Sequence, residues 1–142
     1  MLAFALFLLF LTSCSSNASD RFLAQGRAIN QELLHDLEEI QDIDALLVIL
    51  PQLERRFNQL VEVMIQARRY QIKKKCSWQP LEEDRLLSKE LAQELHRIYQ
   101  IPAARSLIEK SQESALMKLD AFENKMRKIA DNSTNKNFNG LE

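Results

Sequence analysis

Apolar side chains in the middle of this chain recur at alternating spacings of four and three residues. This spacing is typical of one buried stripe on a helix, and here it runs for three heptads, through Leu46, Leu50, Leu53, Phe57, Leu60, Met64 and Ala67. Only two glycines and three prolines interrupt the 142 residues, whereas Leu, Glu, Gln, Lys, Arg and Ala are abundant. The sequence therefore predicts an all-α fold.

Four helices are expected from the apolar spacing and the prolines. The first runs from about residue 19 to residue 40, the second begins near Asp42 or Asp44, the third follows Pro80, and the fourth starts at Pro102. Short connections favour antiparallel neighbours, either as an up-down-up-down bundle or as two long hairpins. The helical domain should cover residues 20–130 and hold one modest core, and residues 131–142, which lack periodicity, should be disordered.

Two residues inside these patterns need interpretation. Pro51 removes a backbone hydrogen bond from the second helix, so we expect a kink or a new helix start there. Gly26 falls on the apolar stripe of the first helix. It either permits close approach of another helix or is a glycine tolerated near a frayed start.

The amino-terminal segment joins an apolar run, residues 2–11, directly to Leu11-Thr12-Ser13-Cys14. Ten apolar residues form a helix of about 15 Å, half of a hydrocarbon core, so a membrane span is not expected. The small residues before the cysteine resemble the lipobox of bacterial lipoprotein signal peptides. The resemblance implies that residues 1–13 are removed, that Cys14 receives the lipid, and that residues 14–19 form a flexible tether. In such lipoproteins an aspartate after the cysteine is associated with retention in the inner membrane, and this chain has Ser15 there. The resemblance therefore also implies attachment to the outer membrane, on its periplasmic side.

Charge is distributed unevenly along the helices. Residues 19–44 hold seven acids and two bases, whereas residues 45–76 hold two acids and seven bases, which favours pairing the first two helices. Bases also gather where the second and fourth helices end, at Arg68, Arg69, Lys73, Lys74, Lys75, Lys125, Arg127 and Lys128. These clusters either face anionic lipid headgroups near Cys14 or a partner, or simply complement the helix dipoles.

A second hypothesis concerns residues 73–80. Lipidation of Cys14 would leave Cys76 unpaired beside three lysines, where it either forms an intermolecular disulfide in a homodimer or packs under Trp78. Bases with Trp78 in a loop could bind an anionic ligand or a protein cleft. The other interpretation is that Trp78 caps the core.

Catalytic and metal sites have little support in the sequence. Glu32 and His35 have the Glu-x-x-His spacing of di-iron bundles, but Gln93 replaces the carboxylate in the nearest second copy, before His96. The helical projection also turns both histidines toward solvent. There is no Gly-x-Ser-x-Gly turn or glycine-rich phosphate loop, and a net charge of −1 gives no support to nucleic-acid binding.

We therefore expect no enzyme, metal or cofactor. The favoured function is a membrane-anchored, non-catalytic helical module, structural or for protein interaction, with an unidentified protein partner. The alternative is a ligand-binding or enzyme-inhibiting module that uses residues 73–80.

Overall fold

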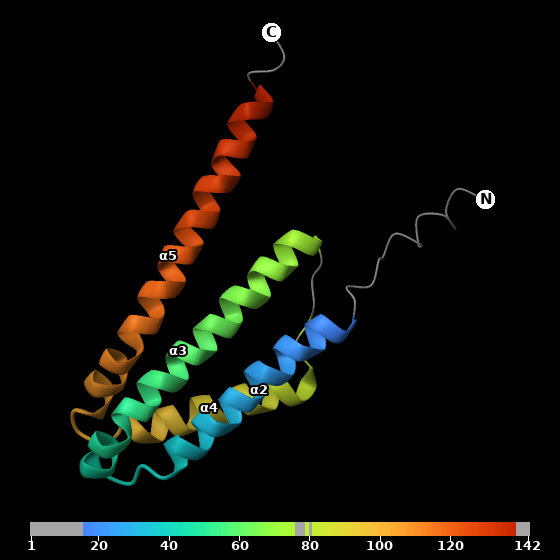
Figure 1. Cartoon of the computed structure of the whole chain (residues 1–142). Helices are drawn as coiled ribbons and strands as arrows, with labels where there is room; N and C mark the ends of the chain where they lie inside the picture. Colours follow the sequence, from blue (N-terminus) through green and yellow to red (C-terminus); the bar gives the residue numbers. More distant parts are fainter. Residues whose placement is uncertain (1–15, 76–78, 80, 139–142) are drawn as a thin grey trace.

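Four α-helices form the part of the chain that the computed structural model describes, which is residues 16–75, 79 and 81–138. They are α2 (Ser16–Glu38), α3 (Ile43–Lys74), α4 (Glu82–Ile98) and α5 (Ala104–Phe138) (Figure 1). No strand occurs among the described residues. The predicted all-α helical bundle is confirmed.

Helices α2 and α3 form an antiparallel hairpin. Helix α3 begins next to Asp42, one of the two expected starts, and the Asp42 side chain caps it by accepting a hydrogen bond from the Ala45 N–H at 2.8 Å. Asp36, only 5% exposed on α2, accepts hydrogen bonds from Gln52 Nε2 at 2.6 Å and Arg56 Nε at 3.3 Å on α3. Arg56 also pairs with a second acid of α2, Glu32, so the predicted attraction between these helices is confirmed.

Helix α4 lies along α2 in the parallel sense. Near its start Asp84 binds Arg27, and near its end Arg97 binds the carbonyl of Ile40, with the same separation of 57 positions in both contacts. Arg97 Nη1 lies 2.7 Å from the Ile40 oxygen, and Nη2 lies 3.0 Å from the Leu37 oxygen. A guanidinium from α4 thus caps the carbonyl end of α2.

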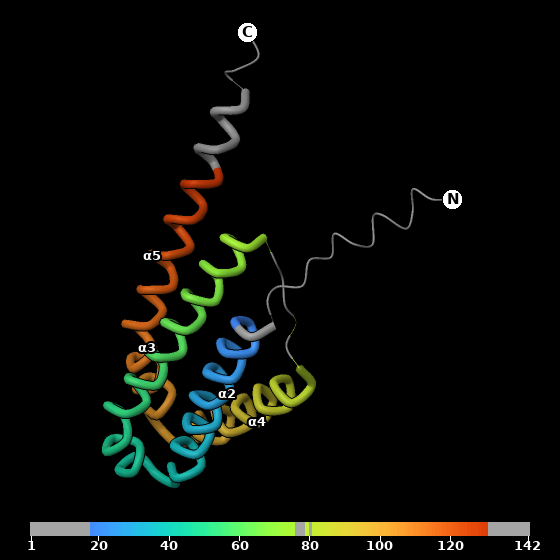
Figure 2. The backbone as a smooth tube through the Cα atoms, turned by 45° about the vertical axis from the view of Figure 1, so that its right-hand side comes forward, coloured from blue at the N-terminus to red at the C-terminus, as the bar shows by residue number. Residues whose placement is uncertain are grey.

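Helix α5 lies along α3, also in the parallel sense. Ser114 contacts Asn58 and Lys118 contacts Glu62, each 56 positions apart. The main helix contacts are therefore α2 with α3, α2 with α4 and α3 with α5. Figure 2 shows α4 and α5 diverging from their connecting turn. The expectation that this short connection makes antiparallel neighbours is wrong, because each helix packs against the first hairpin instead.

One hydrophobic core joins the four helices. Its fully buried large side chains are Leu37, Ile40, Leu46, Leu53, Ile98 and Ile108. Burial of such a side chain contributes roughly 1.5–3 kcal/mol. One predicted seam position is wrong: Met64 is 46% exposed, whereas its neighbour Val63 is buried. Helix α3 packs against both α2 and α5, so its buried residues lie on more than one stripe.

Several predicted boundaries also shift. Helix α2 already begins at Ser16, inside the expected tether, and α3 continues through Pro51 instead of starting again there. Pro102 lies in the turn before α5, where Ala103 has a φ of 68°, and not in the first helical turn. Helix α5 runs on through residues 131–138 of the expected tail. Propagating an existing helix needs only one residue fixed per hydrogen bond, and no glycine or proline interrupts this stretch.

Candidate membrane-facing surface and binding pockets

The basic residues of α3 lie at the end of the molecule where α2 begins, and those of α5 follow further along the helix that packs on the other side of α3. Tyr70 of α3 packs against Phe22 of α2 with ring centroids 5.9 Å apart, and Arg69 lies 5.5 Å from the ring centroid of Phe122 on α5. In Figure 1, α3 ends beside the start of α2, whereas α5 lies on the other side of α3 and extends beyond both helices. We call this end of the molecule the basic end; its exposed bases are Arg68, Arg69, Lys73, Lys74, Lys75, Lys125, Arg127 and Lys128.

The opposite end of the α2–α3 hairpin carries exposed acids. Glu38 and Glu39 close α2, and Asp42 and Asp44 open α3. Residues 63–75 of α3, in contrast, contain no acid. The hairpin is therefore charged oppositely at its two ends, positive where α2 begins and negative at the α2–α3 turn.

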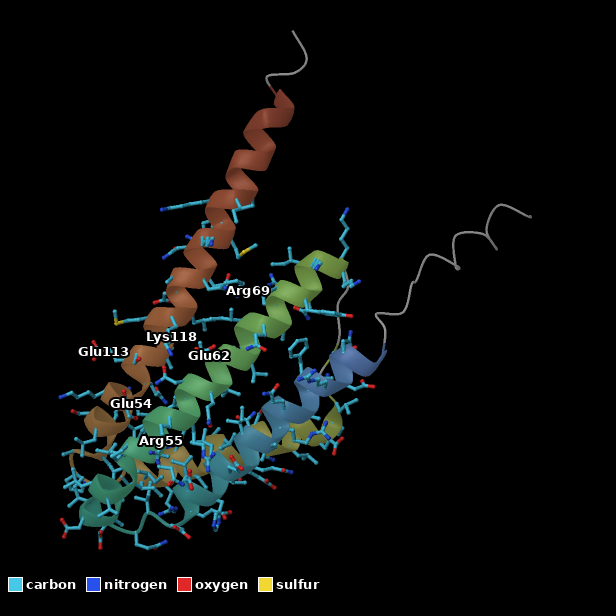
Figure 3. All side chains as sticks on the ribbon, viewed as in Figure 1. Glu54, Arg55, Glu62, Arg69, Glu113 and Lys118 are labelled. Carbon is cyan, nitrogen blue, oxygen red and sulfur yellow. The ribbon has the colours of Figure 1, made fainter. Side chains whose placement is uncertain are left out.

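A groove of about 800 Å³ runs between the outer faces of α3 and α5. Its apolar lining residues are Leu50, Pro51, Leu107, Met117 and Ala121. Charged residues also line it, and Figure 3 shows several of them, including Glu54, Glu113 and Lys118, along the two helices. Met117 is 66% exposed, and the nearby α3 residue Val48 is 84% exposed.

A smaller pocket of about 200 Å³ lies between α2, α3 and α4. Its lining is mainly apolar and includes Phe22, Leu23, Gly26, Leu60, Val63, Met64, Ala67 and Leu87. A Cβ atom added at Gly26 would meet no atom within 4 Å. Gly26 therefore does not permit a close helix contact, which was one interpretation of the sequence; its missing side chain leaves space in this pocket.

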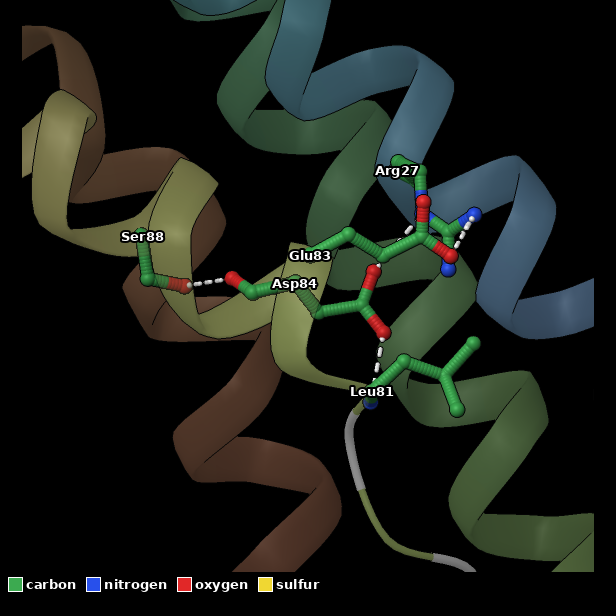
Figure 4. A network of polar contacts seen from close by, with 5 residues as sticks. All are labelled: Arg27, Leu81, Glu83, Asp84 and Ser88. Carbon is green, nitrogen blue, oxygen red and sulfur yellow. Dashed lines mark hydrogen bonds and ion pairs between the residues drawn. The ribbon is translucent and has the colours of Figure 1, made fainter.

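An ion-pair cluster, drawn in Figure 4, contributes Arg27 and Asp84 to the lining of this pocket. Arg27 of α2 contacts Asp84 at 2.8 Å and Glu83 at 2.9 Å on α4. The second oxygen of Asp84 accepts the Leu81 N–H at 2.9 Å, and the Asp84 carbonyl accepts the Ser88 hydroxyl at 2.8 Å. The hydrogen bond from Arg27, helped by the Leu81 N–H, lowers the pKa of Asp84. Asp84 thus caps α4 and fixes it to α2.

The histidines lie on the surface. The His35 side chain is 72% exposed, and its Nε2 lies 3.6 Å from Oε1 of Glu39. Glu32, which shares the Glu-x-x-His spacing with His35, pairs instead with Arg56. His96 is exposed as well. The predicted solvent-facing orientation of both histidines is confirmed. Within residues 16–75, 79 and 81–138, no three His, Cys, Asp or Glu side chains come together as a metal site.

Three predicted site residues, Cys14, Cys76 and Trp78, lie outside the described residues. Lipidation, the disulfide homodimer and the binding loop 73–80 stay predictions, although Lys73, Lys74 and Lys75 are exposed. No helix in the described part of the chain has the apolar length that a membrane span requires.

The α3–α5 groove and the α2–α3–α4 pocket were not found from the sequence. Their lining residues come from different helices, and the only local signal was Gly26 on an apolar stripe. Comparison with protein-family models, curated proteins and solved structures finds no match to this chain.

Proposed function

We propose that this chain is a bacterial lipoprotein anchored through Cys14 to the outer membrane, where it acts as a non-catalytic helical interaction module facing the periplasm. The observation that carries the proposal is the basic end. Five exposed bases lie at the end of α3 beside the start of α2, three more lie on α5, and α2 begins only two residues after Cys14. An anchor at that position holds the basic end close to the lipid surface.

The anchor and the bases contribute differently to membrane binding. Each buried methylene of an acyl chain contributes about 0.8 kcal/mol, so acylation at Cys14 fixes the protein to the membrane. Each base close to an anionic surface contributes about 1 kcal/mol, and this attraction declines within a Debye length. The bases therefore determine which end of the domain faces the lipid.

Helix α5 limits the orientation that the domain can take. The register with α3 places Ala130 level with Lys74, so residues 131–138 extend past the basic end by about 12 Å. The headgroup layer on each side of a bilayer is only about 5–7 Å thick. An upright domain would push this polar extension into hydrocarbon. We therefore propose an inclined domain, with α5 lying along the surface.

The α3–α5 groove supports the interaction part of the proposal. It spans residues 107–121 of α5, or about 21 Å, which is the length of a four-turn helix. Helices that dock into grooves place apolar side chains one turn apart on an apolar floor, and a flexible methionine such as Met117 adapts to them. We propose that the groove takes an amphipathic helix from a protein partner.

Intact mass and membrane fractionation of the protein from its own cell test the proposal. We expect the wild type and a Cys76→Ser variant to start at residue 14, carry added acyl mass and sediment with the outer membrane. A Cys14→Ser variant should lack the acyl mass and leave the membrane fraction. A wild-type protein without acyl mass, or a Cys14→Ser variant that stays in the membrane, would contradict the anchor.

A further inference from the structure

The α2–α3–α4 pocket has properties that core packing does not require. A side chain as small as alanine at position 26 would fill part of it without meeting another atom within 4 Å. Alanine is also the better helix former. Glycine here therefore leaves an apolar space open at a cost to helix stability.

The size and lining of the pocket indicate the chemical class of its ligand. A dry apolar cavity of about 150 Å³ takes benzene, and pockets for drug-sized ligands begin near 300 Å³. At about 200 Å³, this pocket fits a length of hydrocarbon chain or a single ring. Val63 and Leu87 are buried on its wall, whereas Met64 is 46% exposed and marks an open side.

The polar residues around the pocket offer no charge to a ligand headgroup. Arg27 is held by Asp84 at 2.8 Å and by Glu83 at 2.9 Å, so its positive charge is already balanced. A ligand recognised mainly by a carboxylate or a phosphate would have to break this cluster, which also fixes α4 to α2. The favoured ligand is therefore a hydrocarbon chain whose polar end stays outside.

We propose that the α2–α3–α4 pocket binds one alkyl chain of a lipid. Phe22 and Leu23 line the pocket and lie within two turns of the start of α2, so the pocket opens near the basic end. The chain could belong to a free lipid or to the anchor on Cys14, which lies eight positions before Phe22, at most about 28 Å even for an extended backbone. The second source rests on the proposed function; the pocket itself does not.

Methionine methyl NMR with decanoate as the probe tests the pocket. The chain from residue 15 onward contains all four helices, with Met64 at the pocket, Met117 in the α3–α5 groove and Met126 elsewhere on α5. We expect decanoate to shift the Met64 signal in a saturable manner and to leave Met117 and Met126 in place. Equal shifts at Met64 and Met117, or no shift at Met64, would overturn the proposal.

Two substitutions on the same helix serve as variant and control. Gly26→Leu places a side chain in the pocket and should weaken decanoate binding at least tenfold, with Gly26→Ala intermediate. Ala24→Leu introduces the same side chain at an exposed position outside the pocket and should leave binding unchanged. Thermal melts confirm that each variant is folded. Unchanged binding to a folded Gly26→Leu variant would refute the site.

Lipidated protein purified from its own cell distinguishes the two sources of the chain. If the anchor fills the pocket, the Met64 methyl signal is already shifted and does not move further when decanoate is added. If a free lipid is the ligand, decanoate still shifts the Met64 signal. The intact mass separates the two proposals. If the protein is unacylated and decanoate shifts the Met64 signal, the pocket proposal is supported and the anchor is contradicted. If the protein is acylated and neither the anchor nor decanoate affects the Met64 signal, the anchor is supported and the pocket proposal is contradicted.

Discussion

Replacing Arg97 by methionine should destabilise the fold although the site lies far from both pockets. Arg97 Nη1 donates to the Ile40 carbonyl at 2.7 Å and Nη2 donates to the Leu37 carbonyl at 3.0 Å, both at the end of α2. Leu37 also accepts the Ile40 N–H at 3.1 Å, so the Ile40 carbonyl suffers the larger loss. A hydrogen bond to a charged group contributes about 1.5–3 kcal/mol. Because the Arg97 side chain is 39% exposed and water can partly replace it, we expect a loss of about 2 kcal/mol.

Urea unfolding followed by circular dichroism measures this loss as a lower midpoint at an unchanged slope. Arg85→Met is the matched control on the same helix, because Arg85 is 65% exposed and only approaches Glu82 at 3.7 Å. The control should lose less than about 0.5 kcal/mol. Arg97→Lys keeps the charge without the fork and should fall between the two. If Arg97→Met loses no more than Arg85→Met, the guanidinium does not hold α4 on α2.

Three further outcomes follow from the same contacts. Gly26→Ala should raise stability by about 0.5–1 kcal/mol in urea unfolding, because the added Cβ meets nothing; a lower midpoint would contradict the open space. Leu46→Ala should lose about 2–5 kcal/mol, whereas Leu47→Ala, next to it but 50% exposed, should lose less than about 1 kcal/mol; equal losses would contradict the core. Asp84→Asn should be less stable than the wild type at neutral pH. Since Arg27 lowers the pKa of Asp84, the carboxylate stabilises the fold above about pH 4 and this contribution is lost as the pH falls through the lowered pKa. The two proteins should therefore converge in acid, and a difference independent of pH would contradict the pairing.

The helices could be predicted from the sequence because their signals are local. The spacing of Leu46, Leu53 and Phe57 indicates a buried helix face by itself, and Asp42 is a capping residue at its start. The exposure of Met64 could not be predicted in the same way. It depends on which helices flank α3, and a heptad pattern does not contain that information.

The packing of α4 and α5 against the α2–α3 hairpin depends on contacts between distant positions. A helical apolar stripe looks the same whether its neighbour runs parallel or antiparallel, and the contacts that show the direction, Arg27 with Asp84 and Arg97 with Ile40, are 57 positions apart. The pocket beside Gly26 also depends on residues that are far apart in the sequence. Whether a glycine permits contact or leaves space is decided by the residues opposite, here Leu60 and Leu87. The part of the basic end on α3 could be anticipated, because its bases lie where α3 ends. Lys125, Arg127 and Lys128 were expected at a helix end, but α5 continues to Phe138, and these bases point to the same end of the molecule because α5 runs parallel to α3.

Binding of the unacylated chain, residue 15 onward, to vesicles tests the membrane-facing basic end most directly. We expect binding to vesicles with anionic lipid, little binding to neutral vesicles, and weakening by salt. Replacing Lys73, Lys74 and Lys75 by glutamine should weaken binding about 100-fold, at about 1 kcal/mol per base. The control replaces three exposed bases that lie outside both the basic end and α5, Arg55, Arg85 and Lys89, by glutamine and should change binding far less. Equal binding to neutral and anionic vesicles, or equal loss in both triple variants, would contradict the account.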